Sequence, residues 1–415
     1  MKRREFLTSA LGLPLVAGND GSKPQSTIMS LQKNHYDVIV IGAGSMGASA
    51  CYFLAARGHK VLGLEQFNVP HEKGSHAGQS RIIRKAYFEH PDYVPLLNRA
   101  YHNWKQIEEL SGIKLYYKTG LLYQGKPEHI VLKGTRQAAD MHNISLNELS
   151  PEESARQFPQ FKLPEGFTSF IEPSAGFITP EKAISTYIAG AIKNGAAIRT
   201  NEKVLDWKKE KEHIKVVTAK EIFYCKKLVV TAGAWAGKLA PQLKPQLKVT
   251  RQIVAWMKPL KPELFSLENF PCWVIADEGR GVYYGFPMLP NDRFVGPAGL
   301  KVAHHFPGVE SDPDNVNRNI SKEDEEDIRY ALQKYLPAAN GALLEFKTCL
   351  YTYSKDENFI IDHLPGFNGD VTIACGFSGH GFKFVSVVGE ILADLAMEGK
   401  TKLPVDFLKL GRFGA

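Results

Sequence analysis

The stretch Tyr36-Asp37-Val38-Ile39-Val40-Ile41-Gly42-Ala43-Gly44-Ser45-Met46-Gly47 places an apolar run directly before a Gly-x-Gly-x-x-Gly motif. The apolar run predicts a buried strand, and the small and apolar residues 48–57 predict a helix after the glycine turn. Residues 60–64 predict a second strand, which Glu65 closes. This order of strand, turn, helix and strand is typical of a βαβ unit at the start of a parallel sheet.

The three glycines have separate physical roles in such a turn. Gly42 allows the tight turn, Gly44 lets the backbone approach a pyrophosphate, and Gly47 lets the helix pack closely on the strand. The helix N-terminus favours phosphate charge. Glu65, 18 residues after Gly47, can accept hydrogen bonds from a ribose. The motif therefore predicts dinucleotide binding, without distinguishing FAD from NAD.

Distant segments are expected to complete the parallel sheet. Residues 227–231 and 370–374 are strand-like, and 384–398 has the pattern of a buried helix. Residues 119–175 and 249–350 contain strand-like runs with many prolines and aromatics, which predict a second, mostly antiparallel domain. We predict an α/β fold whose Rossmann-like domain is discontinuous in sequence. The predicted parts are a signal peptide and linker (1–34), the nucleotide-binding domain (35–118, 176–248 and 352–410) and the substrate domain (119–175 and 249–351).

Composition excludes several other classes of protein. Hydrophobic residues make up 44% and charged residues 23% of the 415 residues, as in an ordinary globular chain. The net charge of +7 comes from scattered basic residues, which favours a solvated basic surface over nucleic-acid binding. The five cysteines are odd in number and irregularly spaced, so we expect neither a disulfide framework nor a metal site.

The first residues have the pattern of an export signal. Met1-Lys2-Arg3-Arg4-Glu5-Phe6-Leu7 is followed by a short apolar stretch to Gly18. The pair Arg3-Arg4 suggests a twin-arginine signal, whose export machinery would carry the folded protein to the periplasm. The apolar run is too short for a membrane span, which needs about 20 residues. The alternative is a polar tail on a cytoplasmic protein.

The segment from Gly74 to Arg84 is a polar, glycine-containing loop. It reads Gly-Ser-His-Ala-Gly-Gln-Ser-Arg-Ile-Ile-Arg and carries Arg81 and Arg84, three residues apart. Such a pair can bind a carboxylate or a phosphate. The alternative for this segment alone is a pair of surface arginines.

Five further motifs follow the glycine motif along the chain: GSHAGQSRIIRKAY (74–87), YYGFP (283–287), AGLKVAHH (298–305), CLYTYSKDENFIID (349–362) and GFSGHGFKF (376–384). With the glycine motif they resemble the monomeric sarcosine oxidase and N-methyltryptophan oxidase family, FAD-dependent amine oxidases of the D-amino-acid-oxidase-like superfamily. The resemblance covers about residues 36–410. It implies that the bound dinucleotide is FAD.

The resemblance also implies roles for individual residues. Cys349 matches the cysteine joined by a thioether to the 8α carbon of the flavin. Arg84 and Lys383 match the pair that binds the substrate carboxylate. Arg81 and Lys301 match basic residues on the opposite flavin face, where Lys301 would activate oxygen. Taken alone, Lys301 would be a solvated strand lysine and Cys349 a buried apolar cysteine.

Further positions follow from the same motifs. His305, Tyr284 and Tyr351 match residues around the substrate amine, and His380 lies in the loop that contacts the flavin. Fixed cations beside the flavin would stabilise negative charge on it. The expected cofactor contacts are Gly42, Gly44, Ser45, Met46, Gly47, Glu65, Ser75, His76, Arg81, Gly233, Trp235, Cys349, Gly376, Gly379, His380, Gly381, Phe382 and Lys383.

The chain departs from the family pattern in four places. Ala77 replaces a second histidine, and Gln79 stands at an acidic position. The segment 287–295 is longer than the family's loop, and 273–276 differs from the usual pocket wall. These departures put the flavin potential, the rate of covalent attachment and the identity of the substrate in question.

The resemblance implies an oxidase of N-methyl amino acids such as sarcosine, which uses FAD and molecular oxygen and acts as a monomer. The products would be formaldehyde, a primary amino acid and hydrogen peroxide. One alternative substrate is a cyclic imino acid of the pipecolate type, and one alternative acceptor is a molecule other than oxygen. A third alternative is a flavin-binding protein without turnover.

Overall fold

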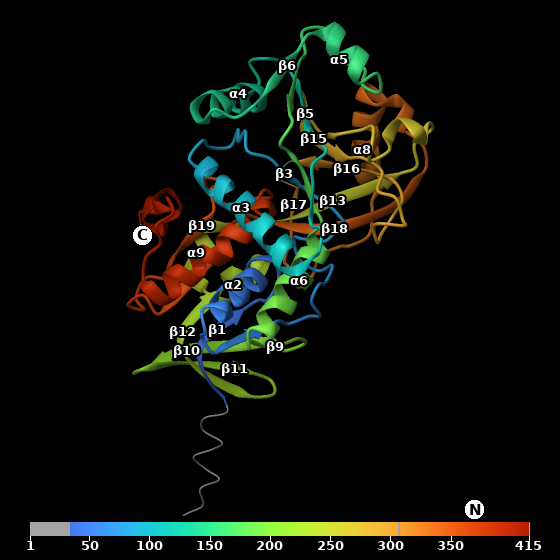
Figure 1. The fold of residues 1–415 in the computed structure, drawn as a ribbon. Coiled ribbons are helices and arrows are strands. Elements are labelled where there is room, and N and C mark those ends of the chain that lie inside the picture. The colour runs from blue at the N-terminus through green and yellow to red at the C-terminus, as the bar shows by residue number, and fades with distance from the viewer. Residues whose placement is uncertain (1–33, 306–307, 415) are drawn as a thin grey trace, which may run out of the picture. The chain divides into compact units, whose positions relative to one another are not determined.

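The glycine turn lies between strand β1 (His35–Ile41) and helix α2 (Ser45–Ala56) in the computed structural model of the chain (Figure 1). The structure describes residues 34–305 and 308–414. Strand β2 (Val61–Leu64) runs parallel to β1, as predicted. Helix α2 begins earlier than the predicted residue 48, because the last residues of the glycine motif already form its first turn.

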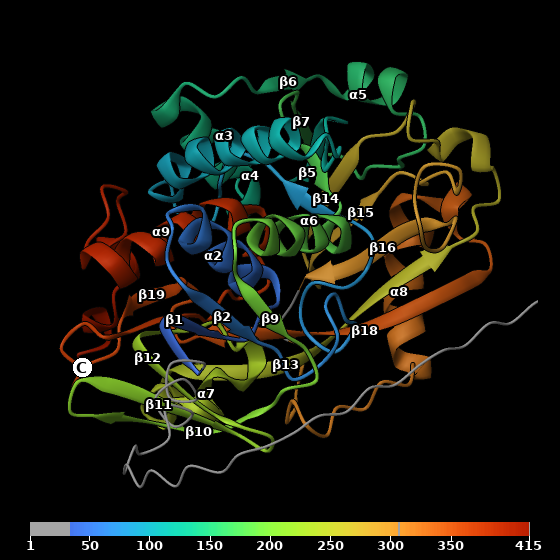
Figure 2. The same ribbon diagram turned by 60° about the horizontal axis from the view of Figure 1, so that its bottom comes forward.

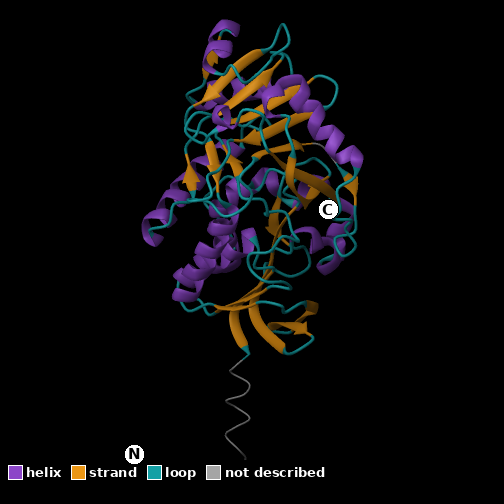
Figure 3. Cartoon of the chain, turned by 90° about the vertical axis from the view of Figure 1, so that its right-hand side faces the viewer, coloured by secondary structure: helices purple, strands orange, loops and turns teal. Residues whose placement is uncertain are grey.

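The first sheet has eight strands and is built from distant parts of the chain. Its order is β10-β11-β12-β1-β2-β9, with β20 beside β12 and β19 beside β20. The pairs β1–β2, β2–β9 and β12–β20 are parallel, and the β10–β11 hairpin is seen as orange strands at the lower end of Figure 3. The remaining strands are β9 (Ala197–Arg199), β10 (Val204–Glu210), β11 (His213–Thr218), β12 (Ile222–Val230), β19 (Ile360–His363) and β20 (Val371–Cys375).

Two hydrophobic cores lie on opposite faces of this sheet. In β1 the buried side chains of Val38 and Val40 join the core that contains the helices, whereas Ile39 and Ile41 join the core formed with β10, β11 and β12. This alternation is the period of two that a strand imposes. Figure 2 shows α2 and α9 side by side, although they come from opposite parts of the sequence. Most helical residues of the first core come from α2, α3 (Tyr93–Ser111), α6 (Pro180–Lys193) and α9 (Val385–Glu398).

The second sheet has nine strands and is mostly antiparallel, as expected. Its order is β17-β13-β16-β15-β14-β5-β7-β6, with β18 also paired to β13. Helix α8 (Lys322–Tyr335) packs on one face through Ile328 and Leu332. The strands are β5 (Leu121–Gly125), β6 (Asn147–Leu149), β7 (Thr168–Glu172), β13 (Leu247–Met257), β14 (Cys272–Asp277), β15 (Gly281–Phe286), β16 (Leu300–His305), β17 (Val309–Glu310) and β18 (Leu343–Ser354).

A small sheet and three helices complete the described elements that concern the fold. The small sheet has the order β3-β8-β4, and β3 contains Arg81 but not Arg84 of the arginine-bearing segment. Its strands are β3 (Arg81–Ile83), β8 (Gly176–Ile178) and β4 (Tyr116–Tyr117). The helices are α4 (Ile130–His142), α5 (Pro151–Gln157) and α7 (Ala236–Leu239).

The predicted fold class is confirmed: the chain combines a partly parallel α/β sheet with a mostly antiparallel sheet. Residues Tyr36–Ala415 form one compact unit, and the boundaries predicted between the two domains stay a prediction. The predicted export signal lies outside the described residues. In the part of the chain that the structure describes, no helix is both long and apolar enough to cross a membrane.

Candidate functional site

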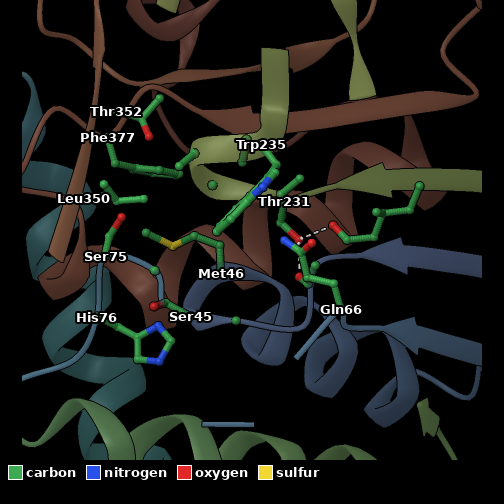
Figure 4. A pocket seen from close by; sticks show the side chains of 18 of the residues that line it. Ser45, Met46, Gln66, Ser75, His76, Thr231, Trp235, Leu350, Thr352 and Phe377 are labelled. Atoms are coloured by element: carbon green, nitrogen blue, oxygen red, sulfur yellow. Dashed lines mark hydrogen bonds between the residues drawn. The ribbon is translucent and has the colours of Figure 1, made fainter. Parts of the chain in front are cut away.

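A cavity of about 430 Å³ follows the glycine turn and reaches the second sheet. Figure 4 shows Met46, Trp235, Leu350 and Phe377 around its open centre. Fifteen residues predicted from the sequence line it: Gly42, Gly44, Ser45, Met46, Glu65, Ser75, His76, Arg81, Gly233, Trp235, Tyr351, Gly376, Gly379, Gly381 and Phe382. The cavity is therefore bounded by segments that lie far apart in the sequence, from residue 41 to residue 382.

The backbone around the glycine turn requires glycine at two positions. Gly42 has a φ of +88°, and a side chain there would approach the carbonyl oxygen of Thr231 to 2.6 Å. A Cβ on Gly47 would lie 1.8 Å from the carbonyl oxygen of Gly42, so Gly47 serves the packing of helix on strand and does not line the cavity. Gly44 has open space beside it, since no atom lies within 4 Å of its would-be Cβ. This open space at a helix N-terminus suits a pyrophosphate.

Polar groups along the cavity also fit FAD. Burial raises the pKa of Glu65 to about 7, although one of its oxygens accepts a bond from the backbone N–H of Phe67 (3.0 Å). Its carboxyl group can take hydrogen bonds from ribose hydroxyls. His76 Nε2 and Thr352 Oγ1 are buried and have no hydrogen-bond partner among the described residues. Most buried polar atoms in proteins have a partner, and a bound ligand or water can supply one to these two atoms.

Two basic side chains, the buried Lys301 and the half-buried Arg81, converge on the turn Gly78–Ser80. The ammonium nitrogen of Lys301 lies 2.6 Å from the carbonyl oxygens of both Gly78 and Ser80. Arg81 donates to the carbonyl oxygens of Ser80 (2.9 Å) and Ala77 (2.5 Å). Burial lowers the pKa of Lys301 well below its usual value, and the charge of Arg81 adds to this effect. Lys301 lies outside the cavity lining, but Arg81 contributes to it.

The second sheet presents the other predicted residues on one face. In β16, Leu300 and Val302 pack toward α8, so Lys301 and His305 point to the opposite face. Tyr284 in β15 is paired with Ala303, which places it on that same face.

The side chains on this face contact one another. The Nδ1 atom of His305 lies 3.4 Å from the hydroxyl oxygen of Tyr351, and the ring centroids of His305 and Tyr284 are 6.4 Å apart. Burial lowers the pKa of His305 to about 4, so its ring is neutral at neutral pH. The face therefore presents a neutral imidazole beside two phenols.

Arg84 and Lys383 lie on the same aromatic ring. The guanidinium carbon of Arg84 is 4.4 Å, and the Lys383 ammonium 5.1 Å, from the ring centroid of Tyr87. Arg84 also bonds both carboxylate oxygens of Glu89 at 2.6 Å. The pKa of Lys383 is lowered to about 7, chiefly by burial and also by the charge of Arg84, while Glu89 acts in the opposite direction.

Arg84 and Glu89 each stabilise the charged form of the other. Burial would raise the pKa of Glu89, but the charge and hydrogen bond of Arg84, with the nearby His380 and Lys383, together outweigh burial and lower this pKa to about 2. In turn, the charge of Glu89 raises the pKa of Arg84 despite burial. The sequence did not predict a role for Glu89, because this residue lies just after the motif 74–87 and belongs to no periodic pattern.

His380 fixes the position of Lys383. The carbonyl oxygen of His380 accepts a bond from the Lys383 ammonium (2.8 Å). Its ring contacts the Tyr87 hydroxyl through Nδ1 (2.6 Å) and the carbonyl oxygen of Glu357 through Nε2 (3.1 Å). Because a carbonyl only accepts, Nε2 carries the proton and Tyr87 donates to Nδ1. His380 thus lies behind the cavity wall and does not line the cavity.

Cys349 is buried on β18, beside the cavity-lining residues Leu350 and Tyr351. Burial raises the pKa of its thiol, while the charges of Arg81 and Lys301 act to lower it. All five cysteines are free thiols. Within residues 34–305 and 308–414, no group of three His, Cys, Asp or Glu side chains could hold a metal ion.

Comparisons with known proteins identify the family of the chain. The FAD dependent oxidoreductase family matches residues 37–395. A monomeric sarcosine oxidase from Arthrobacter sp. is 39% identical over 92% of this chain and 98% of its own. An N-methyl-L-tryptophan oxidase from Yersinia pestis is 32% identical over 91% and 99% of the two chains.

Among solved structures, NikD, an unusual amino acid oxidase essential for nikkomycin biosynthesis, superposes with a TM-score of 0.80 at 22% identity. It covers 91% of this chain and 98% of its own, and this likeness concerns the fold. The glycine turn, the open cavity beside it and the sequence matches together lead to one conclusion: the chain belongs to the FAD-dependent oxidoreductase family, within the group of monomeric sarcosine oxidases and N-methyl-L-tryptophan oxidases.

Proposed function

We propose that the protein is an FAD-dependent oxidase of N-methyl amino acids, of which sarcosine is the simplest. An N-methyl amino acid, oxygen and water would give the primary amino acid, formaldehyde and hydrogen peroxide. FAD, when bound, would accept the two electrons and the hydrogen removed from the N-methyl carbon. We further propose that FAD is attached through Cys349 and that the protein acts as a monomer.

The observation that carries the proposal is an excess of positive charge around Tyr87. Arg84 and Lys383 both lie on this buried ring, but Glu89 supplies a single negative charge beside them. A buried charge without a partner is costly, so the group as it stands favours one more anion. The carboxylate of an amino acid substrate fits this requirement.

The residues around this clamp would orient the rest of the substrate. With its carboxylate on Arg84 and Lys383, the amine would face His305, Tyr284 and Tyr351. A neutral His305 accepts a hydrogen bond from the amine and leaves the amine's lone pair free of competing positive charge. Such positioning lowers the entropic part of the barrier.

Peroxide release with a small panel of amines tests this function. The panel contains sarcosine, N-methyl-L-tryptophan and a cyclic imino acid of the pipecolate type, each assayed in air and with an artificial electron acceptor. We expect peroxide from an N-methyl amino acid in air. A response to the cyclic imino acid alone, or to the artificial acceptor alone, would favour the corresponding alternative. Bound flavin with no turnover on any amine would favour a binding protein.

Binding of a carboxylate without an amine should weaken as the pH rises through 7. The pKa of Lys383 is about 7, so the charged form is present below that pH and is lost above it. Because the anion prefers charged Lys383, its apparent dissociation constant should rise by about tenfold per pH unit above 7. The change in the flavin's visible spectrum with acetate measures this. In Lys383→Met the slope should vanish, and a pH-independent wild type would contradict the prediction.

We also propose export through the twin-arginine machinery. Replacing Arg3 and Arg4 by lysines should leave the precursor in the cytoplasm, because this route reads the arginine pair. Fractionation of expressing cells measures the location, with the unaltered precursor as the control. Normal periplasmic accumulation of the double-lysine variant would show that the leader is read in another way, or not at all.

A further inference from the structure

The carbonyl oxygens of the turn Gly78–Ser80 accept hydrogen bonds from both Lys301 and Arg81. Contacts that fix this turn therefore also fix the positions of these two side chains. Lys301 and Arg81 share the carbonyl oxygen of Ser80. From the other side, the Glu181 carboxylate accepts bonds from the backbone N–H groups of Gly78 (2.8 Å) and Gln79 (3.2 Å). A shift of this turn would therefore move the Lys301 ammonium and the Arg81 guanidinium together.

The side chain of Gln79 connects this turn to two distant parts of the chain. It is 7% exposed, and its Oε1 accepts a bond from the indole N–H of Trp256 (3.0 Å). Its Nε2 faces the carbonyl oxygens of Val295 (3.3 Å) and Pro297 (3.4 Å). The indole only donates and the carbonyls only accept, which fixes the orientation of the amide. Both ends of the amide are thus used.

The two carbonyls belong to the loop 287–299, which joins β15 to β16. These strands carry Tyr284 and Lys301. The loop closes directly on Gln79, since a Cβ at Gly296 would lie 3.0 Å from its Nε2. Phe294 is buried against Tyr117, with ring centroids 4.8 Å apart, whereas Val295 is 97% exposed. The loop therefore has one side in water and the other side over the turn.

We propose that Gln79 is a positioning residue: it anchors the loop 287–299 onto the turn Gly78–Ser80 and so holds the side chains of Lys301 and Arg81 in place. The anchoring itself is independent of the chemistry. Only its consequence for the reaction with oxygen rests on the proposed function.

The substitution Gln79→Glu keeps the hydrogen-bond acceptor of the side chain and removes its donor, so it tests the two ends of the amide separately. Glutamate has the same length and still accepts a bond from Trp256, but it cannot donate to Val295 and Pro297. Its carboxylate would face two carbonyl oxygens, which is repulsive. The loop should then open more often, while the Trp256 contact remains.

Trypsin can measure this opening directly. Arg293 is the only basic residue in the loop, and its side chain is 51% exposed. The next residue, Phe294, is 5% exposed, so cleavage between them requires the loop to leave the protein. In Gln79→Glu we expect cleavage at this bond to be roughly 5- to 30-fold faster, from the loss of two hydrogen bonds. Mass spectrometry of the first fragments identifies the bond that is cut.

Glu268→Gln is the matched control. It removes the ion pair between Arg293 and Glu268 (2.5 Å) on the water-exposed side of the same loop. Exposed pairs contribute little, so cleavage at Arg293 should change by less than about twofold. If Gln79→Glu does not fold, Gly296→Ala perturbs the same contact from the loop side and should give the same selective rise.

Stopped-flow absorbance of the holoprotein gives the second readout. Gln79→Glu should slow the reaction of the reduced protein with oxygen, through the misplaced cations, but should leave anaerobic reduction by the amine substrate within about threefold. If trypsin cleaved Gln79→Glu and Gly296→Ala at Arg293 at the wild-type rate, the proposed anchoring of the loop by Gln79 would be wrong. Equal acceleration at sites across the chain would overturn it too, since that signals general loss of stability. Failure of the wild type to oxidise any amine would refute the proposed function and leave the proteolysis result standing.

Discussion

Acid precipitation of the wild-type holoprotein should carry its yellow colour down with the polypeptide, and the flavin mass should appear on the peptide that contains Cys349. A thioether forms from a thiolate, and Arg81 and Lys301 favour the thiolate of Cys349 against the opposing effect of burial. The S–C bond replaces an S–H and a C–H bond, and the two electrons removed would pass to oxygen. Cys349→Ser should therefore release all of its FAD on denaturation.

Cys375 provides the matched control for this prediction. It is also buried, and it lies beside Gly376 and Ala374, which line the cavity. Burial raises its pKa to about 12, with only a weaker opposing influence from Arg412. Cys375→Ser should keep the flavin bound through acid treatment. Complete loss of flavin from the wild type would refute covalent attachment, but the oxidase function would survive, because the glycine turn does not depend on the thioether.

Replacing Lys383 by methionine should weaken amino acid substrates selectively. Methionine keeps the length and apolar contacts of the stem but removes the charge that lies on Tyr87. Losing one charge-assisted hydrogen bond costs about 1.5–3 kcal/mol, or roughly 10- to 150-fold in kcat/KM. The amine that lacks the carboxyl group should show no such penalty, and kcat/KM for both substrates measures the difference. An equal loss for both would indicate a flavin or folding defect.

A test of Arg84 requires a double variant, because Arg84 forms an ion pair with Glu89. Arg84→Gln alone would strand the carboxylate of Glu89, and breaking a buried ion pair costs about 3–5 kcal/mol of stability. The double variant Arg84→Gln/Glu89→Gln removes both charges and should fold better than the single variant, as thermal unfolding would show. It should still discriminate poorly between the amino acid and the decarboxylated amine. Recovery of full discrimination in the double variant would exclude Arg84 from the carboxylate site.

The βαβ start and the glycine turn follow from local sequence patterns. Apolar runs and glycines act over a few residues, so the positions of β1, β2 and α9 could be read from local patterns. The motif at Cys349 and the pair Arg84 and Lys383 were also visible, because a resemblance to known oxidases spans them. Their roles stay proposals.

Which side chains contact one another depends on the tertiary structure. Gln79 contacts Val295, 216 residues away, and Lys301 bonds Gly78, 223 residues away. Such contacts depend on how two sheets are placed, and no local period encodes that placement. Glu89 is close to Arg84 in sequence, yet it lies in an irregular segment where spacing does not predict direction. The sequence therefore marked the cofactor turn, whereas the charge balance around Tyr87 and the anchoring of the loop arise from long-range packing.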